Sequence, residues 1–362
     1  MALVVACHGA LHLPWLLGVD DPPMGYVPGA RAVVLFVVVQ YGQVGVCVFL
    51  TVSGYFLSAR GFSWRRAAST WARMLVYSLL CLAGGSCLAG MGLAPARVGE
   101  LFAPGVLPRT LATALLPFLS GAYWFVSAYL VMLAVSPFLN VLLACVPRRG
   151  VEGLLLMLGF LSVWRLWAPA VDSWSMVSYA LLCYLAGGWV RRYGAVLSRR
   201  RLPLACVAVA ATLLMGVFDR VAMGSGPLAR LLGWGAQVKP GVVVLPVVVA
   251  VVLVMLAVGA DGSRVPARAA GVVSRLGSAM FGVYLLHENQ FGYRLVWPAA
   301  ARLVPAVPGP VGTMARSVAA VLLVFAACTL AALLVDRLLA DRAARLAGRL
   351  AVLCFGKLVS AL

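Results

Sequence analysis

The chain has 362 residues, of which 64% are hydrophobic and 11% are charged, and its formal net charge is +19. This composition excludes an ordinary soluble globular domain and indicates a protein with several membrane-spanning helices. The arginines that make the chain basic are spread over many loops and form no single basic face. We therefore expect the charge to report membrane topology and not nucleic-acid binding.

Apolar stretches long enough to cross a hydrocarbon core of about 30 Å as helices predict about ten spans. In chain order they cover residues 1–17, 35–58, 70–90, 122–143, 151–168, 176–192, 203–219, 238–259, 276–298 and 317–339. The stretch 101–120 is also apolar, but Pro104, Pro108 and Pro117 interrupt it. We interpret it as a re-entrant or interfacial segment in an external loop.

Lys and Arg collect in alternate loops between these spans, as they do on the cytoplasmic side of a membrane. The loops after the second, fourth, sixth and eighth spans with the adjoining ends of the spans, together with the tail, hold 19 of the 29 basic residues. We therefore predict an all-α polytopic transmembrane bundle in the plasma membrane with both termini in the cytoplasm. Residues 1–340 would form the membrane domain, and residues 341–362 a cytoplasmic amphipathic tail.

The nine cysteines include no CxxC pair and fall mostly inside predicted spans. In that setting cysteine behaves as a small polarisable hydrophobe. We expect neither a disulfide framework nor a zinc site.

All three histidines lie inside apolar segments, where an imidazole is costly and a function is the default explanation. His8 and His12 are four residues apart, so they share one face of the first helix. One could act as a base while the other positions it. A satisfied structural pair and a metal pair are the alternatives, although within the spans only Glu288 is placed to add a further ligand.

His287 and Glu288 are neighbours in the predicted span 276–298. On one continuous helix they point about 100° apart, so they cannot form a mutual dyad, and His287 instead shares a face with Tyr284. Glu288 is the only one of the three glutamates that lies well inside a predicted span, since Glu152 stands at the edge of the span 151–168. We expect it to line a polar cavity, with a purely structural ion pair as the alternative.

Arg66, Arg73 and Tyr77 form one stripe on the third predicted span, at intervals of seven and four residues. Such a stripe suits an anionic ligand that enters from the cytoplasm. The alternative for Arg66 is an ordinary positive-inside residue. Trp124, at the outer end of the fourth span, suits either a cavity or an aromatic belt at the membrane interface.

Several segments together resemble one known family. VFLTVSGYFLS followed by a basic stretch and RMLVYS, then AYWFVSAYLVMLAVSPFLN, then SRLGSAMFGVYLLHENQFGYRLVW are similar, in the family's order, to signature segments of integral-membrane acyltransferase family 3, which O-acylates surface glycans in bacteria. MALVVACHGALH resembles the first helix of the branch associated with capsular or exopolysaccharide clusters, with both histidines in place. The resemblance covers nearly the whole chain.

The resemblance implies an acyl-CoA donor such as acetyl-CoA on the cytoplasmic side, and a hydroxyl of a glycan or lipid-linked saccharide as acceptor near the outer side. His8 matches the family's catalytic histidine, and Arg73 matches an arginine near the donor. The family normally carries an arginine eleven residues before that histidine, whereas this chain begins seven residues before His8. We expect a true start further upstream. The alternative is an impaired copy that lacks a donor-site arginine.

The mechanism that we expect uses His8 as the general base toward a sugar hydroxyl, with His12 or His287 orienting it. Arg73, Tyr77 or Ser53 would stabilise the tetrahedral intermediate. The donor-binding set comprises Arg60, Arg65, Arg66, Arg73 and Tyr77. The acceptor or cavity set comprises Ser53, Trp124, Tyr129, Tyr284, His287, Glu288 and Arg294. We expect no metal and no resident cofactor, since acetyl-CoA is a co-substrate, and a two-step route through an acyl-enzyme remains open.

Two other function classes remain open. A polar cavity with paired histidines and Glu288 would also serve a proton-coupled transporter or a flippase of sugar-linked substrates, although no inverted repeat is visible in the sequence. An inactive paralogue is the other alternative.

Overall fold

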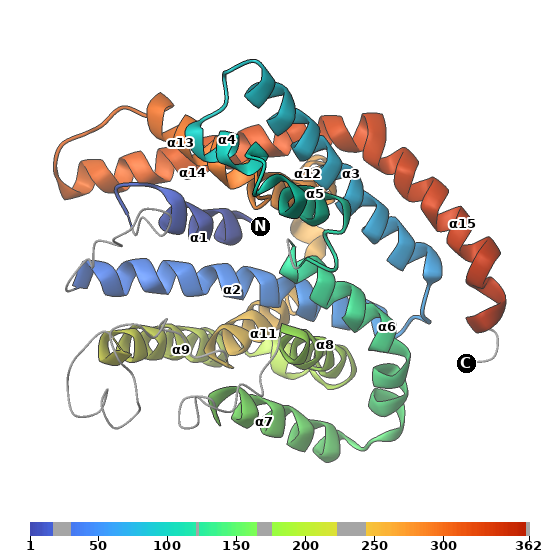
Figure 1. Ribbon diagram of the computed structural model, residues 1–362. Coiled ribbons are helices and arrows are strands. Elements are labelled where there is room, and N and C mark those ends of the chain that lie inside the picture. The colour runs from blue at the N-terminus through green and yellow to red at the C-terminus, as the bar shows by residue number, and fades with distance from the viewer. Residues whose placement is uncertain (17–29, 121–122, 165–175, 223–243, 360–362) are drawn as a thin grey trace. The chain divides into compact units, whose positions relative to one another are not determined.

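The computed structural model describes residues 1–16, 30–120, 123–164, 176–222 and 244–359 (Figure 1), and all regular elements in these ranges are helices. In chain order they are α1 (Ala2–His12), α2 (Ala30–Leu57), α3 (Trp64–Gly90), α4 (Ala96–Gly99), η1 (Glu100–Phe102), α5 (Leu107–Leu115), α6 (Trp124–Cys145), α7 (Arg148–Trp164), α8 (Met176–Tyr193), η2 (Leu197–Arg199), α9 (Arg201–Ala222), α11 (Val244–Val258), η3 (Gly262–Arg264), α12 (Ala267–His287), α13 (Gly292–Leu303), α14 (Gly309–Val335), the π-helical turn η4 (Asp336–Ala340) and α15 (Asp341–Val359).

Six of the described helices are long and apolar enough to cross a membrane, so the chain is a multi-pass membrane protein. They cover Val33–Leu57, Trp64–Gly90, Trp124–Cys145, Arg201–Val221, Ala267–His287 and Gly309–Phe355. The last of these runs without interruption through α14, η4 and into α15. Helices α1 and α11 are also apolar but have only 11 and 15 residues. The predicted total of about ten spans is therefore not confirmed within the described ranges, and the orientation of the termini stays a prediction.

Most predicted spans coincide with a helix. The predicted spans 35–58, 70–90, 122–143, 176–192, 203–219 and 317–339 correspond to α2, α3, α6, α8, α9 and α14. Residue 17 and the segments 165–168 and 238–243, which complete three further predicted spans, lie outside the described residues, as does residue 122 at the start of the span 122–143. The single span predicted over 276–298 is wrong, because the chain forms two helices there, α12 and α13, with a turn between them. In the segment 101–120 the longest helix is α5, with 9 residues.

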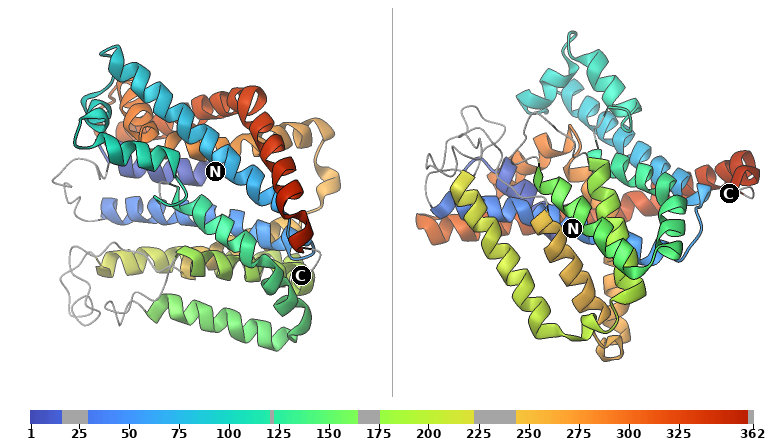
Figure 2. Two further views of the ribbon diagram at one scale, coloured as in Figure 1. Left: turned by 45° about the vertical axis from the view of Figure 1, so that its right-hand side comes forward. Right: turned by 90° about the horizontal axis from the view of Figure 1, so that it is seen from below.

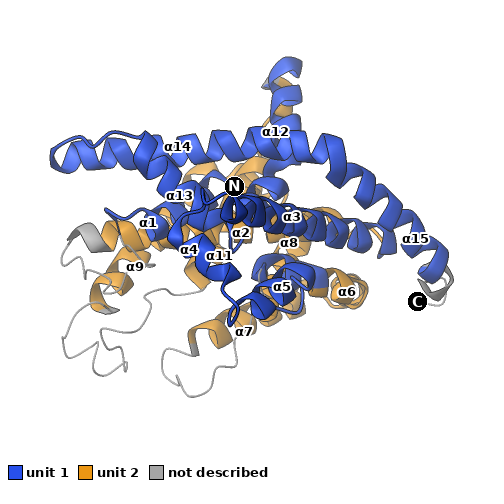
Figure 3. Ribbon diagram, turned by 45° about the horizontal axis from the view of Figure 1, so that its top comes forward, with its two compact units in different colours: residues 1–24, 62–130, 265–362 blue, residues 25–61, 131–264 orange. Residues whose placement is uncertain are grey.

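The chain divides into two compact units (Figure 3). Unit 1 contains residues 1–24, 62–130 and 265–362, and unit 2 contains residues 25–61 and 131–264. Unit 1 holds both ends of the chain, and all three histidines lie in it. The candidate active site is therefore built from segments of unit 1 that are distant in sequence.

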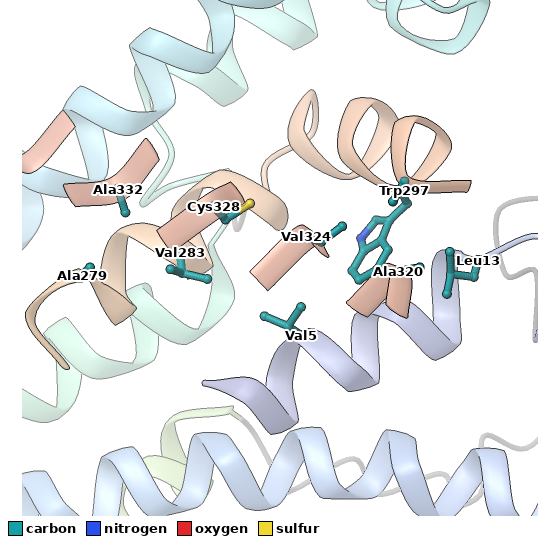
Figure 4. Close-up of a cluster of buried hydrophobic side chains, with 10 residues drawn as sticks. Val5, Leu13, Ala279, Val283, Trp297, Ala320, Val324, Cys328 and Ala332 are labelled. Carbon is teal, nitrogen blue, oxygen red and sulfur yellow. The ribbon is translucent and has the colours of Figure 1, made fainter. Parts of the chain in front are cut away.

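The apolar core of unit 1 joins α1 to α12, α13 and α14 (Figure 4). The members of this core are Val5, Leu13, Ala279, Val283, Trp297, Ala300, Ala320, Val324, Cys328 and Ala332. Gly9 lies where α1 comes close to α13, because a Cβ at this position would stand 3.2 Å from the ring of Trp297. This packing fixes α1, which carries two of the histidines, against the helices that carry the third.

Helix α15 packs along α3 within unit 1, as the views in Figures 1 and 2 show. The hydroxyl of Ser69 donates to the carbonyl of Ala344 at 2.9 Å, and the rings of Trp64 and Phe355 lie 5.1 Å apart. Helix α15 begins at Asp341, and the predicted division at residue 340 between a membrane domain and a cytoplasmic tail stays a prediction. One face of this arginine-rich helix is thus covered by α3.

Unit 2 is organised around the contact between α2 and α8. Glycines occupy the crossing: a Cβ on Gly187 would overlap the backbone of Thr51, and one on Gly54 would overlap the backbone of Tyr184. Small residues let helix backbones approach closely, which is the usual way helices associate in a membrane. A second cluster, formed by Val190, Leu204, Val252, Val254 and Met255, joins α8, α9 and α11.

Candidate active site

The two histidines of α1 lie on one face of the helix, as their spacing predicts. The ring centroids of His8 and His12 are 6.1 Å apart. Val5 of the same helix and Leu13, which directly follows it, are fully buried in the core of unit 1. Because those apolar side chains anchor α1, the imidazoles are held in a fixed position relative to α12 and α13.

The third histidine ends a helix. Helix α12 stops at His287, and α13 begins at Gly292. In between, the side-chain oxygen of Asn289 accepts a hydrogen bond from the amide of Phe291 at 2.9 Å, a local turn that competes with helix continuation. The predicted geometry for His287 and Glu288 on one continuous helix therefore does not apply.

The break brings His287 and Glu288 to the same atom of His8. His8 Nδ1 lies 2.8 Å from His287 Nε2 and 3.1 Å from a carboxylate oxygen of Glu288. The same carboxylate oxygen is 3.9 Å from Nε2 of His12. Glu288 is thus paired with histidines, and His287 and Glu288, which were predicted to point apart on one helix, form one cluster with His8.

The hydrogen bonds assign the proton on each ring. His287 Nδ1 lies 2.6 Å from the carbonyl oxygen of Val283, which can only accept, so Nδ1 carries the proton. In the neutral ring Nε2 of His287 must then accept, and His8 donates to it from Nδ1. His8 Nε2 is left with its lone pair. This is the arrangement that a general base requires, with an oriented ring and one basic nitrogen.

Aromatic side chains surround the cluster. His12 stacks on Tyr293, with ring centroids 5.0 Å apart, and the edge of Tyr284 meets His287 at 6.3 Å, so His287 and Tyr284 do share a face. His287 is fully buried. An apolar surrounding strengthens the electrostatic interaction between His8 and Glu288.

The ligand atoms of His8, His287 and Glu288 all lie within 4.8 Å of one another, so the cluster also has the composition of a metal site. Nitrogens that share a tetrahedral zinc ion at about 2.0–2.1 Å would stand roughly 3.3 Å apart. The 2.8 Å between His8 and His287 is instead a hydrogen-bond distance. The geometry favours proton sharing.

Arg73 and Tyr77 on α3 contact carboxylates of the helices that follow α14. Arg73 donates to Asp336 at 3.2 Å and also to Asp341, while the Tyr77 hydroxyl donates to Asp336 at 3.0 Å. Tyr77 is fully buried. The stripe predicted to face an anionic ligand therefore includes an ion pair between α3 and the turn that precedes α15.

The other predicted residues are dispersed. Arg65 and Arg66 lie in the first turn of α3, where Arg65 is exposed. Arg60 and Ser53 belong to unit 2, and the Ser53 hydroxyl donates to the carbonyl of Phe49 at 2.8 Å. Arg294 donates to the carbonyl of Gln290 at 2.7 Å.

Two aromatic residues predicted for the cavity lie in unit 1 beside Phe125. Trp124 meets the ring of Phe125 edge-on at 6.2 Å, and Tyr129 stacks on it at 6.4 Å. The ring of Phe125 in turn meets Tyr284 edge-on at 5.4 Å. Trp124 and Tyr129 are thus linked to the histidine cluster through Phe125 and Tyr284.

Sequence reasoning missed several polar residues. Tyr123 and Asn289 are buried beside the turn that carries Glu288, and Asp336 and Asp341 pair with Arg73. The signal for Asn289 was its place in the polar run HENQ inside an apolar segment. In unit 2, Asp219 is fully buried in α9 and accepts from Gln40 at 2.6 Å.

The chain matches the family model of the acyltransferase domain of family 3 over residues 1–335. Comparisons with curated proteins and with solved structures gave no match. The family match spans most of the chain and includes every residue of the histidine cluster. The chain therefore belongs to acyltransferase family 3 and is a membrane acyltransferase.

Proposed function

We propose that this protein transfers an acetyl group from cytoplasmic acetyl-CoA to a hydroxyl of a surface polysaccharide or its lipid-linked precursor, with His8 as general base. The observation that supports this most directly is the set of hydrogen bonds around His8, which directs Nδ1 to His287 and Glu288 and leaves Nε2 as the basic nitrogen. The resemblance of the first helix to the polysaccharide-modifying branch of the family supports the acceptor class.

A sugar hydroxyl is a weak nucleophile at neutral pH, and its deprotonation during attack contributes about 10²–10⁴-fold to the rate. His8 Nε2 takes the hydroxyl proton as the sugar oxygen bonds to the thioester carbonyl carbon. The tetrahedral intermediate then collapses, the carbon–sulfur bond breaks, and the coenzyme sulfur leaves with that proton. The products are the O-acetyl ester and free coenzyme A.

Glu288 stabilises the charge that develops on His8 during this step. Once Nε2 has gained a proton, the imidazolium ring lies 3.1 Å from the Glu288 carboxylate at its other nitrogen. An opposite charge at this distance favours the charged ring, and it costs little reorganisation because it is already in place. His287 is held by its hydrogen bond to the carbonyl of Val283 and in turn keeps the His8 ring oriented.

The donor is the anionic partner in this reaction. Arg65 and Arg66, in the first turn of α3, supply guanidinium groups whose geometry suits phosphate oxygens of the coenzyme. The aromatic rings of Tyr293 and Trp297 beside His12 help exclude water, which would otherwise compete with the sugar for the acetyl group.

The test is the O-acetyl content of the host's surface polysaccharide, measured by proton NMR in a deletion strain complemented with wild type or variants. We expect deletion to remove O-acetyl signals and wild type to restore them. His8→Gln, which keeps hydrogen-bonding capacity but has no basic nitrogen, should restore none. Glu288→Gln should restore a small fraction.

Glu152→Gln is the matched control for Glu288→Gln. Glu152 pairs with Arg148 on the exposed side of α7 in unit 2, so its neutralisation should leave O-acetylation at the wild-type level. Unchanged acetylation after deletion would contradict the proposal. Complete absence of the polymer from the surface would instead support a transporter or flippase.

A further inference from the structure

The turn between α12 and α13 creates the cluster, so whatever holds this turn controls the cluster. On an unbroken helix, neighbours such as His287 and Glu288 would point about 100° apart. In the structure both approach Nδ1 of His8. This convergence requires that the helix end at His287 and that the next residues keep one fixed path.

Tyr123 replaces the hydrogen bond that would continue the helix. In an unbroken helix the carbonyl of Leu285 would pair with the amide of Asn289, four residues on. Here that carbonyl accepts from the hydroxyl of Tyr123 at 3.1 Å. The same hydroxyl accepts from the side-chain amide of Asn289 at 2.6 Å. One hydroxyl thus binds a carbonyl in the last turn of α12 and also the side chain of Asn289, whose amide would have taken that carbonyl in a continuous helix.

Asn289 completes the turn from its other side-chain atom, which accepts from the amide of Phe291 at 2.9 Å. Tyr123 is fully buried and Asn289 is 3% exposed, so water does not compete for these bonds. Phe291 is itself buried against Val98 and Leu101. The four residues of the turn are therefore held by hydrogen bonds on one side and by apolar packing on the other.

We propose that Tyr123 and Asn289 are positioning residues for acyl transfer, which hold the Glu288 carboxylate against Nδ1 of His8 by fixing the break between α12 and α13. This inference rests on the proposed role of His8 as general base. Neither residue acts on the substrate. Their contribution to the rate passes through Glu288.

That dependence is testable with a double-mutant cycle. Tyr123→Phe, Glu288→Gln and the combined variant are compared in inverted membrane vesicles of the host, which contain the acceptor, with radiolabelled acetyl-CoA as the probe. We expect Glu288→Gln to lower kcat about a hundredfold and Tyr123→Phe about tenfold, within the range that general-base catalysis contributes. In the Glu288→Gln background, Tyr123→Phe should cost less than twofold more. KM for acetyl-CoA should stay unchanged.

Asn289→Ser is the second variant. Serine can still form a local turn with the following amides but is too short to reach Tyr123, so it separates the link to Tyr123 from the turn itself. It should lower kcat in the wild-type background and cost less than twofold with Glu288→Gln. The matched control is Tyr41→Phe in unit 2, which removes a 2.7 Å hydrogen bond to Thr212 and should leave kcat unchanged.

If the losses in kcat multiply in the combined variants, the inference is wrong. A general structural role would lower kcat by the same factor whether or not Glu288 is present. Full activity of Tyr123→Phe and Asn289→Ser would overturn the inference as well. The proposed function fails by a different result, which is label transfer that persists in His8→Gln.

Discussion

In the proposed mechanism His8 acts through Nε2, because Nδ1 is the nitrogen that His287 and Glu288 contact. Its Nδ1 is shared between the acceptor nitrogen of His287 and the carboxylate of Glu288, at 2.8 and 3.1 Å. Since the Val283 carbonyl fixes the proton on His287, the direction of the whole chain of hydrogen bonds follows. The basic site on His8 is a consequence of a backbone carbonyl two hydrogen bonds away.

This assignment predicts a specific tautomer. The chain has only three histidines, so protein labelled with ¹⁵N in histidine rings gives three sets of ring signals. In detergent at pH 8 we expect His8 and His287 to be neutral rings that carry the proton on Nδ1. Signals are assigned with His8→Gln, His12→Gln and His287→Gln. A His8 ring protonated on Nε2 would contradict the proposed base.

The ion pairs of Arg73 lead to a second prediction, which concerns stability. Its guanidinium bridges Asp336 and Asp341, and removal of one member of such a partly buried group leaves the others without compensation. We expect Arg73→Ala and Asp336→Asn each to lower the free energy of unfolding by about 1–2 kcal/mol, after allowance for the partial exposure of the group. The measurement is the thermal unfolding midpoint of purified protein in detergent.

Arg66→Ala, one charge removed from the same helix, should change stability by no more than about 0.5 kcal/mol. A donor-binding role would give a different pattern for Arg73. In that case Arg73→Ala would raise KM for acetyl-CoA while Asp336→Asn would not, and stability would be unaffected.

At the scale of elements, helices α2 and α8 illustrate how the helices within unit 2 pack together. Gly187 and Gly54 lie at their crossing, where backbone meets backbone. Membrane helices gain little from the hydrophobic effect when they associate, so close van der Waals packing has to supply the attraction. Gly54 of α2 and Gly187 of α8 are therefore packing residues, although glycine is unfavourable for a helix itself.

A pair of identical substitutions tests this. Gly187→Ala would place a Cβ over the backbone of Thr51 and 2.7 Å from the amide nitrogen of Tyr55, so α2 and α8 must separate. We expect Gly187→Ala to lower the free energy of unfolding by about 1–3 kcal/mol. Gly153→Ala in α7 meets nothing within 4 Å and should be neutral or stabilising by up to about 1 kcal/mol. Equal thermal midpoints for the two variants would contradict the packing role of Gly187.

The element that sequence periodicity misplaced is the span 276–298. Apolar residues continue through FGVYLLHENQFGYRLVW at a spacing compatible with a helix, so the pattern alone predicts no break. The break depends on the hydroxyl of Tyr123, which lies 162 positions from Leu285 along the chain. Local sequence contains the turn-forming Asn289 but not the partner that makes the turn the favoured path.

At the scale of the whole molecule, the arginine distribution predicts which loops face the cytoplasm. The end of α8, the connection to α9 and the start of α9 together carry Arg191, Arg192, Arg199, Arg200 and Arg201. Positively charged loops are retained in the cytoplasm during insertion. Green fluorescent protein fused after Gly194 or after the C-terminal residue should therefore fluoresce. Alkaline phosphatase should be active when fused after Gly92 and inactive when fused after Gly194. Active phosphatase at Gly194 would contradict the predicted topology.

The sequence by itself was sufficient for the membrane class, for the position of most long helices and for the family, because each depends on composition or on residues close together in the chain. It also indicated that His8 and His12 share a face, which follows from helical spacing alone. The tertiary structure alone decided that His287 and Glu288 meet at one nitrogen of His8, 279 and 280 positions away, and that Arg73 pairs with Asp336 and Asp341. Contacts over such separations depend on how helices pack and where they break, and neither the periodicity nor the composition of any one segment contains that information.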